Sequence, residues 1–159
     1  MNINIREMLA SDLNGVAEIH KKSFSRQNNS LEWIECNHRA FPRIMIYVAE
    51  YGSELAGYIQ WIQKSGFRRE CVLELEQMAV LEEFRCNGVG KALISESMLA
   101  LKSYLGAKGV SIKNVIVTTR DDNHAKKLYE STLGAKEEYV IKQLFSGNES
   151  VLIARDVKI

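Results

Sequence analysis

The apolar residues of this chain recur at two spacings, one typical of strands and one typical of helices. Alternation over residues 3–8 predicts a first strand. Apolar positions over 13–24, three and four residues apart, predict a helix that Ser11 or Asp12 can cap. The polar run 25–30 ends that helix, so the chain begins with one strand and one amphipathic helix.

Further patterns continue this sequence of helices and strands. A second helix is expected from Ser30, which can cap it, to the residues before Pro42. The later predictions are, in chain order, a hairpin of strands 44–50 and 55–63, a central strand over 71–80, a helix over 89–105, a strand over 110–119, a helix capped by Asp121 or Asp122 and ending at Leu133, and a last hairpin of strands 137–145 and 150–157. Three antiparallel strands before a crossover helix predict a mixed sheet, an α/β fold in the α+β sense rather than a doubly wound one.

Length, composition and charge limit the partners. A chain of 159 residues, 46% hydrophobic and with one proline, predicts a single domain over 1–159. A net charge of +1 provides no basic face for nucleic acid or an anionic membrane, so we expect neither as a partner. Small molecules or a protein terminus fit this charge better.

The cysteines and histidines predict neither disulfides nor a metal site. Cys36, Cys71 and Cys86 form no Cys-x-x-Cys pair, and no histidines stand at metal-ligand spacing. The chain has no apolar leader, and no apolar run near the roughly 18 residues of a membrane span. We therefore expect a reduced cytoplasmic protein.

The clearest chemical signal is the glycine-containing turn after the central strand. Gly88 and Gly90 allow a tight turn and a close approach by a ligand. The first amides of the next helix have no internal partner and lie at the positive end of its dipole. With the charge of Arg85 they suit a phosphate or pyrophosphate. Ala92 and Leu93 exclude a Walker loop and a dinucleotide fingerprint, which need other residues there.

Two segments resemble one known family. The run Glu76-Gln-Met-Ala-Val80, followed by Arg85-x-x-Gly88-x-Gly90-Lys-Ala-Leu93, resembles the acetyl-CoA motif of the GNAT superfamily of N-acetyltransferases. The run Asp122-Asn-His-Ala-Lys-Lys-Leu-Tyr-Glu130, with Leu133-Gly134-Ala135, resembles the Asn-x-x-Ala-x-x-Leu-Tyr-Glu and Leu-Gly-Phe segment of that family. Both segments stand in the family's order and at about its spacing.

The resemblance implies a single-domain GNAT fold, a mostly antiparallel central sheet with a splayed strand pair and about four flanking helices. It also implies direct transfer of an acetyl group from acetyl-CoA to a primary amine of a small molecule or peptide. Its motifs assign cofactor binding to Met78, Ala79 and Val80, to Arg85, Cys86, Asn87, Gly88, Val89, Gly90 and Lys91 around the pyrophosphate, and to Asp122 or Asn123 in place of the family's asparagine.

Acetyl transfer to an amine needs a base and an acid. A protonated amine must lose a proton, and Glu74 and Glu76 on the central strand are the candidate bases. The resemblance places Glu74 where histone-acetylating members keep a glutamate base. It also implies that Tyr129 protonates the departing coenzyme A thiolate.

The acceptor is the least defined part of the prediction. By resemblance its walls come from the first helical pair and the first hairpin, with Phe24, Trp33, Phe41, Tyr58 and Trp61 as candidate residues. Aromatic walls with a carboxylate suit an apolar or aromatic amine. From family habit we also expect a homodimer.

Three alternatives stay open at this point. One is a non-catalytic acyl-CoA-binding sensor or interaction module. Another is a ribosomal-protein N-terminal acetyltransferase, although Val117 replaces a glutamate that such enzymes carry before the tyrosine helix. The third keeps the enzyme but exchanges the acetyl group for a longer acyl group.

Overall fold

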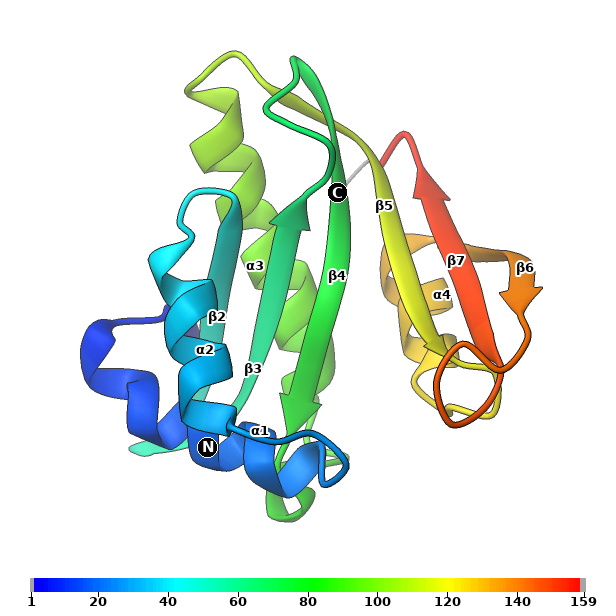
Figure 1. Ribbon diagram of the computed structural model, residues 1–159. Coiled ribbons are helices and arrows are strands. Elements are labelled where there is room, and N and C mark those ends of the chain that lie inside the picture. The colour runs from blue at the N-terminus through cyan, green and yellow to red at the C-terminus, as the bar shows by residue number, and fades with distance from the viewer. Residues whose placement is uncertain (1, 158–159) are drawn as a thin grey trace. The chain divides into compact units, whose positions relative to one another are not determined.

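The computed structural model describes residues 2–157, and it confirms the mixed α/β fold class (Figure 1). The elements, in chain order, are β1 (Ile3–Glu7), the 3₁₀ helix η1 (Ala10–Asp12), α1 (Leu13–Ser23), α2 (Ser30–Arg39), β2 (Ile44–Tyr51), β3 (Glu54–Gln63), β4 (Glu70–Val80), the 3₁₀ helix η2 (Glu82–Phe84), α3 (Val89–Gly106), β5 (Ser111–Arg120), α4 (Lys126–Leu133), β6 (Lys136–Ile141) and β7 (Glu149–Arg155).

Within the described residues the strands form one mixed sheet of seven, in the order β1-β2-β3-β4-β5-β7-β6. The pairs β1–β2, β2–β3, β5–β7 and β6–β7 are antiparallel, and β4 pairs with β5 in parallel. The described register of β4 with β5 runs from Glu70–Ser111 to Leu75–Val117. The end of β4 therefore continues past this register.

The chain divides into two compact units. The first contains the residues up to Ile62 together with Gln77–Ser97, and the second contains Gln63–Glu76 and the residues from Met98 on. Both β4 and α3 thus contribute residues to each unit. The single domain expected from chain length stays a prediction.

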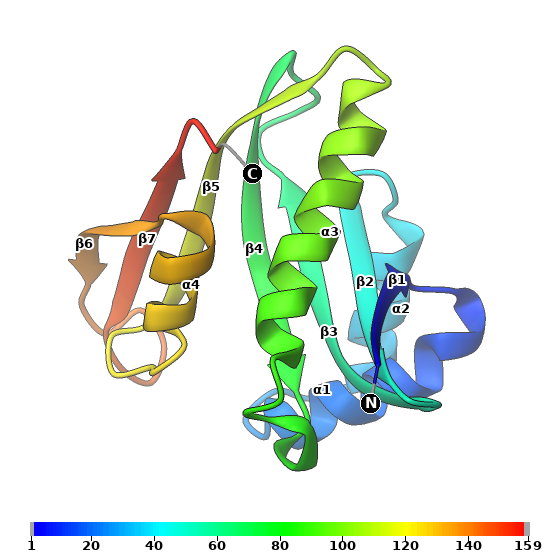
Figure 2. The ribbon, with the colours of Figure 1, turned by 180° about the vertical axis from the view of Figure 1, so that it is seen from behind.

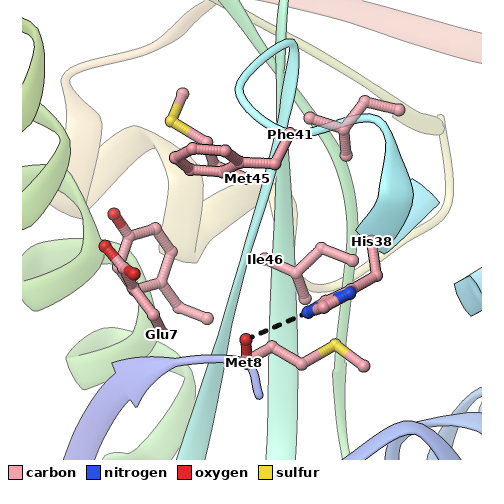
Figure 3. A pocket seen from close by; sticks show the side chains of 8 residues that line it. Glu7, Met8, His38, Phe41, Met45 and Ile46 are labelled. Carbon is pink, nitrogen blue, oxygen red and sulfur yellow. Dashed lines mark hydrogen bonds between the residues drawn. The ribbon is translucent and has the colours of Figure 1, made fainter. Parts of the chain in front are cut away.

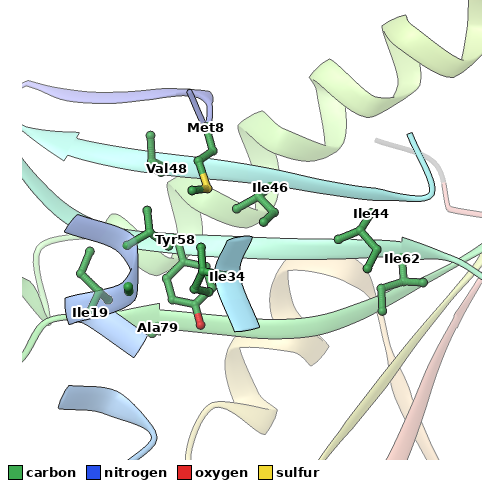
Figure 4. Packing of buried hydrophobic residues seen from close by; sticks show 11 residues of the cluster. Met8, Ile19, Ile34, Ile44, Ile46, Val48, Tyr58, Ile62 and Ala79 are labelled. Carbon is green, nitrogen blue, oxygen red and sulfur yellow. The ribbon is translucent and has the colours of Figure 1, made fainter. Parts of the chain in front are cut away.

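The core of the first unit lies between its helices and one face of its strands. In Figure 1, α1 and α2 cover one face of β2 and β3, and Figure 4 shows Ile19 and Ile34 from these helices packed on Ile46 and Tyr58. The first half of α3 covers the opposite face (Figure 2), where the Trp61 indole N–H donates to the Ser97 hydroxyl at 2.9 Å. Both faces of these strands are buried, which explains why they read as nearly continuous apolar runs.

The second unit is built around β5. This strand pairs with β7 over residues 114–120 and presents Val115 and Val117 as fully buried side chains. Tyr129 and Leu133 are the buried residues of α4, as the helical spacing predicts. Gly134 ends that helix with a φ of 69°, a left-handed value that glycine adopts without strain.

Two predicted caps are wrong. Asp12 precedes α1, but its carboxylate accepts the Leu9 N–H at 2.8 Å and two bonds from Arg6, so no α1 amide is capped by it. The cap position of α2 belongs to Asn29, with a left-handed φ of 52°, and Ser30 is the first helical residue. In both cases a tertiary partner or the backbone angle decided the role.

The last predicted helix and strand pair also differ in their bounds. Helix α4 begins only at Lys126, and neither Asp121 nor Asp122 caps it. Strand β6 ends at Ile141 instead of at 145, because Gln143 takes a left-handed φ of 47° and donates its N–H to the Asn148 side chain at 3.1 Å.

Candidate functional site

The loop predicted to bind phosphate lies in the first unit and joins β4 to α3. Gly88 has a φ of +82°, and a side chain there would be strained although the space around it is open. The helical hydrogen bonds begin with the Ala92 N–H, which donates to the Gly88 carbonyl at 2.9 Å. The amides of the preceding first turn of α3 have no acceptor within the helix. The loop thus offers a row of N–H groups at the positive end of a helix, as the sequence predicts.

Arg85 is held at the mouth of this loop. Its Nε donates to the Val80 carbonyl at 3.0 Å, and the Asn87 side-chain amide donates to the Arg85 carbonyl at 3.0 Å. Cys86 between them is exposed and has a left-handed φ of 62°. The guanidinium is exposed and tethered to the end of β4, so its charge stays close to the amides that follow it in the loop.

Strand β4 approaches β3 unusually closely at the same end. A Cβ on Gly57 would lie 2.5 Å from the Ala79 carbonyl oxygen and 3.2 Å from the Val80 Cα. Ala79 faces the core of the first unit, whereas Met78 and Val80 are half-buried on the other face. Glycine at position 57 is therefore what lets the predicted cofactor-binding end of β4 sit where it does.

The two candidate bases belong to the second unit. Glu74 and Glu76 share one face of β4, as strand alternation predicts, and both are half-buried. The Glu74 carboxylate forms an ion pair with the Lys64 ammonium, 2.8 Å away. If Glu74 is the base, the Lys64 ammonium partly neutralises its negative charge.

Tyr129 is well placed to keep its proton. It is 5% exposed on α4, and burial raises the pKa of its phenol to about 12. At neutral pH this group is a phenol that can still donate.

Asp122 and Asn123 have distinct local roles. Asp122 forms an exposed ion pair with Arg120, with both oxygens 3.1 Å from guanidinium nitrogens. Asn123 donates to the Thr119 hydroxyl at 2.8 Å and accepts the Ala125 N–H at 2.9 Å. Asn123 therefore shapes the turn before α4, and the assignment of either residue to the cofactor stays a prediction.

The predicted acceptor residues fall into two groups. Trp33, on α2, is 36% exposed, and Phe41, which follows α2, is 54% exposed. Phe24 is half-buried. Tyr58 and Trp61 are fully buried, and both side-chain donors are used, by Gln77 at 3.1 Å and Ser97 at 2.9 Å. Of these five residues, only Phe24, Trp33 and Phe41 expose part of their surface to solvent.

A pocket of about 310 Å³ opens elsewhere in the first unit (Figure 3). Its lining is mostly apolar, with Phe41 and Met45 on one side and Glu7 at the edge. The His38 ring lies beside it and Nε2 contacts the Met8 carbonyl at 3.2 Å. Phe41 is the only predicted site residue among those that line it.

Two polar residues of interest were not singled out from the sequence. Gln77 occupies a buried position of β4 between Leu75 and Ala79, and a polar residue on that otherwise apolar face was the available signal. Glu149, at the start of β7, is 6% exposed, and burial raises the pKa of its carboxyl group. Nothing in the local pattern marks Glu149 as buried.

Metal-ligand clusters and helices able to span a membrane are both absent from the described residues. Across residues 2–157, no three or more His, Cys, Asp or Glu side chains are grouped as metal ligands would be. In the same range, none of the helices combines the length and the apolar character required to span a membrane.

Comparison with known proteins gives a match to the acetyltransferase (GNAT) family over residues 13–135. The N-alpha-acetyltransferase of Sulfurisphaera tokodaii is 26% identical over 156 residues, which cover 94% of this chain and 89% of that protein.

Solved structures of the same fold include proteins with different names. Ard1 from Thermoplasma volcanium is 23% identical with a TM-score of 0.76, covering 99% of this chain and all of that one. An aminoglycoside 6'-N-acetyltransferase complexed with coenzyme A is 15% identical with a TM-score of 0.75, covering 98% of each chain. At these identities the likeness establishes the fold.

Proposed function

This chain belongs to the GNAT family of acetyltransferases and is an N-acetyltransferase, and from this premise we propose that its acceptor is the α-amino group of a peptide or protein N-terminus. The observation that carries the proposal is the likeness to an N-alpha-acetyltransferase along 94% of the chain. The co-substrate is acetyl-CoA, and the acetyl group passes directly from the thioester to the amine.

Two exposed segments, residues 24–33 and 141–148, carry few charges, which favours a peptide acceptor over a polycation. Residues 24–33 carry one acid and one base and expose the apolar side chains of Leu31 and Trp33. In the second unit, residues 141–148 carry one lysine and no acid, and expose Leu144 and Phe145. A polyamine or an aminoglycoside needs clustered carboxylates to balance its charges, and neither segment offers them.

An α-amino acceptor also reduces the demand on the base. Its ordinary pKa is about 7.7–8.0, so roughly a quarter of it is neutral at pH 7.4, compared with about one part in a thousand of a lysine amine. A carboxylate that is paired with a cation, as Glu74 is with Lys64, is then basic enough to accept the amine proton, and so is water.

The proposal distributes cofactor binding over the residues of the family motif. The amides from Val89 to Lys91 bind the pyrophosphate together with Arg85, and the backbone of Met78 and Val80 bonds the pantetheine arm. The Val80 carbonyl accepts a bond from Arg85, which ties the phosphate loop to the strand end that would hold this arm.

The transfer step has a simple balance. The neutral amine attacks the thioester carbonyl carbon, a C–N bond forms, and the C–S bond breaks. The proton that the amine loses goes to Glu74, Glu76 or water, and the coenzyme A thiolate takes a proton from Tyr129. The products are the acetylated amine and free coenzyme A.

A panel of acceptors tests the proposal. Hexapeptides that begin with free Met, Ser or Ala are compared with N-terminally blocked peptides that contain lysine, with spermidine and with an aminoglycoside. Thiol release from acetyl-CoA measures the rate, and tandem mass spectrometry locates the acetyl group. Acetyl on the α-amino group supports the proposal, whereas transfer confined to lysine or to the polycations overturns it.

Tyr129→Phe separates an enzyme from a silent acyl-CoA binder. Loss of the general acid should lower kcat by about 10²- to 10⁴-fold without changing the affinity for acetyl-CoA. A parent protein that is stabilised by coenzyme A yet releases no thiol with any acceptor would instead be a binding module.

The two glutamates can be told apart by pH. Glu→Gln at the true base should lower the rate most below the acceptor pKa and progressively less as rising pH deprotonates the amine. If Glu74→Gln and Glu76→Gln both keep the parental profile, the proton leaves through water. The expected homodimer stays a prediction, and light scattering tests it.

A further inference from the structure

A chain of side-chain hydrogen bonds crosses the first unit from β4 to α1. The Trp33 indole Nε1 donates to Gln77 Oε1 at 2.9 Å, and the Tyr58 hydroxyl donates to the same oxygen at 3.1 Å. Gln77 Nε2 donates to Gln27 Oε1 at 3.1 Å. That oxygen also lies 2.9 Å from His20 Nε2. Gln77 on β4 is thus bonded to α2, to β3 and to the segment between α1 and α2.

The direction of every bond in this chain follows from one donor. An indole N–H can only donate, so the atom of Gln77 that faces Trp33 must be the oxygen. The amide nitrogen of Gln77 then faces Gln27, which must accept with its oxygen. His20 Nε2 must therefore carry a proton. The neutral imidazole is the Nε2–H tautomer, and its Nδ1 accepts the hydroxyl of Ser30 at 2.8 Å.

These bonds restrain residues 24–29, the segment between α1 and α2. His20 and Ser30 lie on either side of the segment, Gln27 lies within it, and Gln77 is 50 positions away in the sequence. Residues 25–29 of the segment are exposed, so little apolar burial holds it. Gln27 connects the segment to the interior, because its side chain reaches inward to the buried Gln77.

The network is well suited to hold a surface in one arrangement. Gln77 is 8% exposed and His20 is fully buried, and connected side-chain hydrogen bonds strengthen one another. The pKa of His20 is lowered by burial, which favours the neutral ring. Because Trp33 is bonded through its nitrogen, the rest of its ring stays turned partly to solvent.

We propose that Gln77 is a positioning residue for the acceptor: through Gln27 and Trp33 it fixes residues 24–29 and the exposed indole as a preformed wall that receives the peptide N-terminus. This inference rests on the proposed function. It makes Gln77 a determinant of the acceptor KM, with no part in cofactor affinity.

Three leucine variants test the proposal. Gln77→Leu removes the central amide, and Gln27→Leu removes its partner in an exposed segment where folding is less at risk. Gln60→Leu is the matched control, because Gln60 is a fully buried glutamine of the neighbouring strand β3 and neither of its side-chain polar atoms has a hydrogen-bond partner within residues 2–157. The double variant of Gln77 and Gln27 completes a cycle.

The kinetic measurement uses the hexapeptide of the panel that the parent acetylates fastest. Gln77→Leu and Gln27→Leu should each raise its KM about tenfold, the effect of losing a partly buried hydrogen bond. The KM of the double variant should rise by less than the product of the two single effects, since both single variants lose the bond between Gln77 and Gln27. The acetyl-CoA dissociation constant and kcat should stay within about twofold of the parent.

Two further measurements need no acceptor. Amide hydrogen exchange over residues 24–29 should accelerate in both network variants and stay parental in Gln60→Leu. In an NMR spectrum the chain gives two indole N–H signals, one for Trp33 and one for Trp61. Gln77→Leu should move the first and leave the second, which is bonded to Ser97.

The outcomes separate this inference from the function on which it rests. A parent that acetylates none of the peptides overturns the proposed function, and parental exchange over 24–29 in Gln77→Leu then overturns the restraint as well. If the parent is active but both network variants keep the parental KM, the positioning role is wrong. A rise in the acetyl-CoA dissociation constant equal to that in KM also refutes it, because the defect would then be general.

Discussion

Replacing Gly57 by alanine is the sharpest test of how the end of β4 is positioned. The new Cβ would lie 2.5 Å from the Ala79 carbonyl oxygen, whereas real Cβ atoms essentially never come within 3.0 Å of such an atom. The two strands must therefore separate locally by at least 0.5 Å. Both neighbours on β4 are backbone atoms, so no side-chain rotation relieves the contact.

The cost can be estimated from this displacement. Overpacking of a buried site costs about 1–3 kcal/mol, and in a protein of this size each kcal/mol corresponds to about 2–4 °C. The melting temperature of Gly57→Ala should thus fall by about 2–12 °C. A shift of 0.5 Å also strains any hydrogen bond from Val80 to the pantetheine, so the acetyl-CoA dissociation constant should rise about 2- to 10-fold.

Gly106→Ala is the matched control. Gly106 is the last residue of α3, its φ is not left-handed, and nothing lies within 4 Å of the added Cβ. Its melting temperature should stay constant or rise, because alanine favours a helix by up to about 1 kcal/mol. Differential scanning fluorimetry and calorimetric titration with acetyl-CoA measure both quantities. The reasoning fails if Gly57→Ala keeps the parental melting temperature and affinity, or if the control falls equally.

Three further predictions concern stability. Burial raises the pKa of Glu149, so its ionised form is disfavoured in the folded state and its contribution to stability is lost as pH rises through that pKa; Glu149→Gln should melt higher than the parent at pH 8 and show no gain near pH 4, as thermal scans at both pH values would reveal. The guanidinium of Arg6 lowers the pKa of Asp12, so its stabilisation is present above the ordinary value of 3.8 and is lost as pH falls through the folded pKa; Asp12→Asn should melt lower than the parent at pH 7, and equal melting there would refute the ion pair as a stabilising contact. Ser97→Ala leaves the buried Trp61 N–H without its acceptor and should cost about 1–3 kcal/mol in urea unfolding, so an unchanged midpoint would contradict the bond.

The sequence predicted most elements because their apolar spacing is local. Strand β3 was expected over 55–63 and runs over 54–63, and the glycine turn and the start of α3 follow directly from neighbouring residues. The end of β6 was missed because Leu144 and Phe145 look like strand residues, whereas their side chains are 47% and 76% exposed in a loop. The bond from Gln143 to Asn148 that ends the strand leaves no periodic trace.

In the candidate site, too, the features set by neighbouring residues could be predicted and those set by distant contacts could not. The phosphate loop is contiguous in sequence, so its amides, its glycine and Arg85 could be assigned without a structure. The assignment of Asp12 as a cap failed because Arg6 binds its carboxylate, and no local pattern records that contact. The partners of Gln77 lie 19, 44 and 50 positions away, so nothing near Gln77 in the sequence indicates that it restrains the segment between α1 and α2.

The division of the first unit into two stretches of sequence has a consequence for synthesis. When Ile62 has left the ribosome, β1 and β2 are complete and β3 lacks only its last residue, but Gln77 and the first half of α3 have not yet emerged. At about 5–20 residues per second, the 35 residues from Gln63 to Ser97 take roughly 2 to 7 s. During that interval the Trp61 face of the hairpin has no helix to cover it and Gln27 has no partner on β4. The nascent chain therefore exposes an apolar sheet face for seconds, and such a surface is prone to aggregation until the helix covers it.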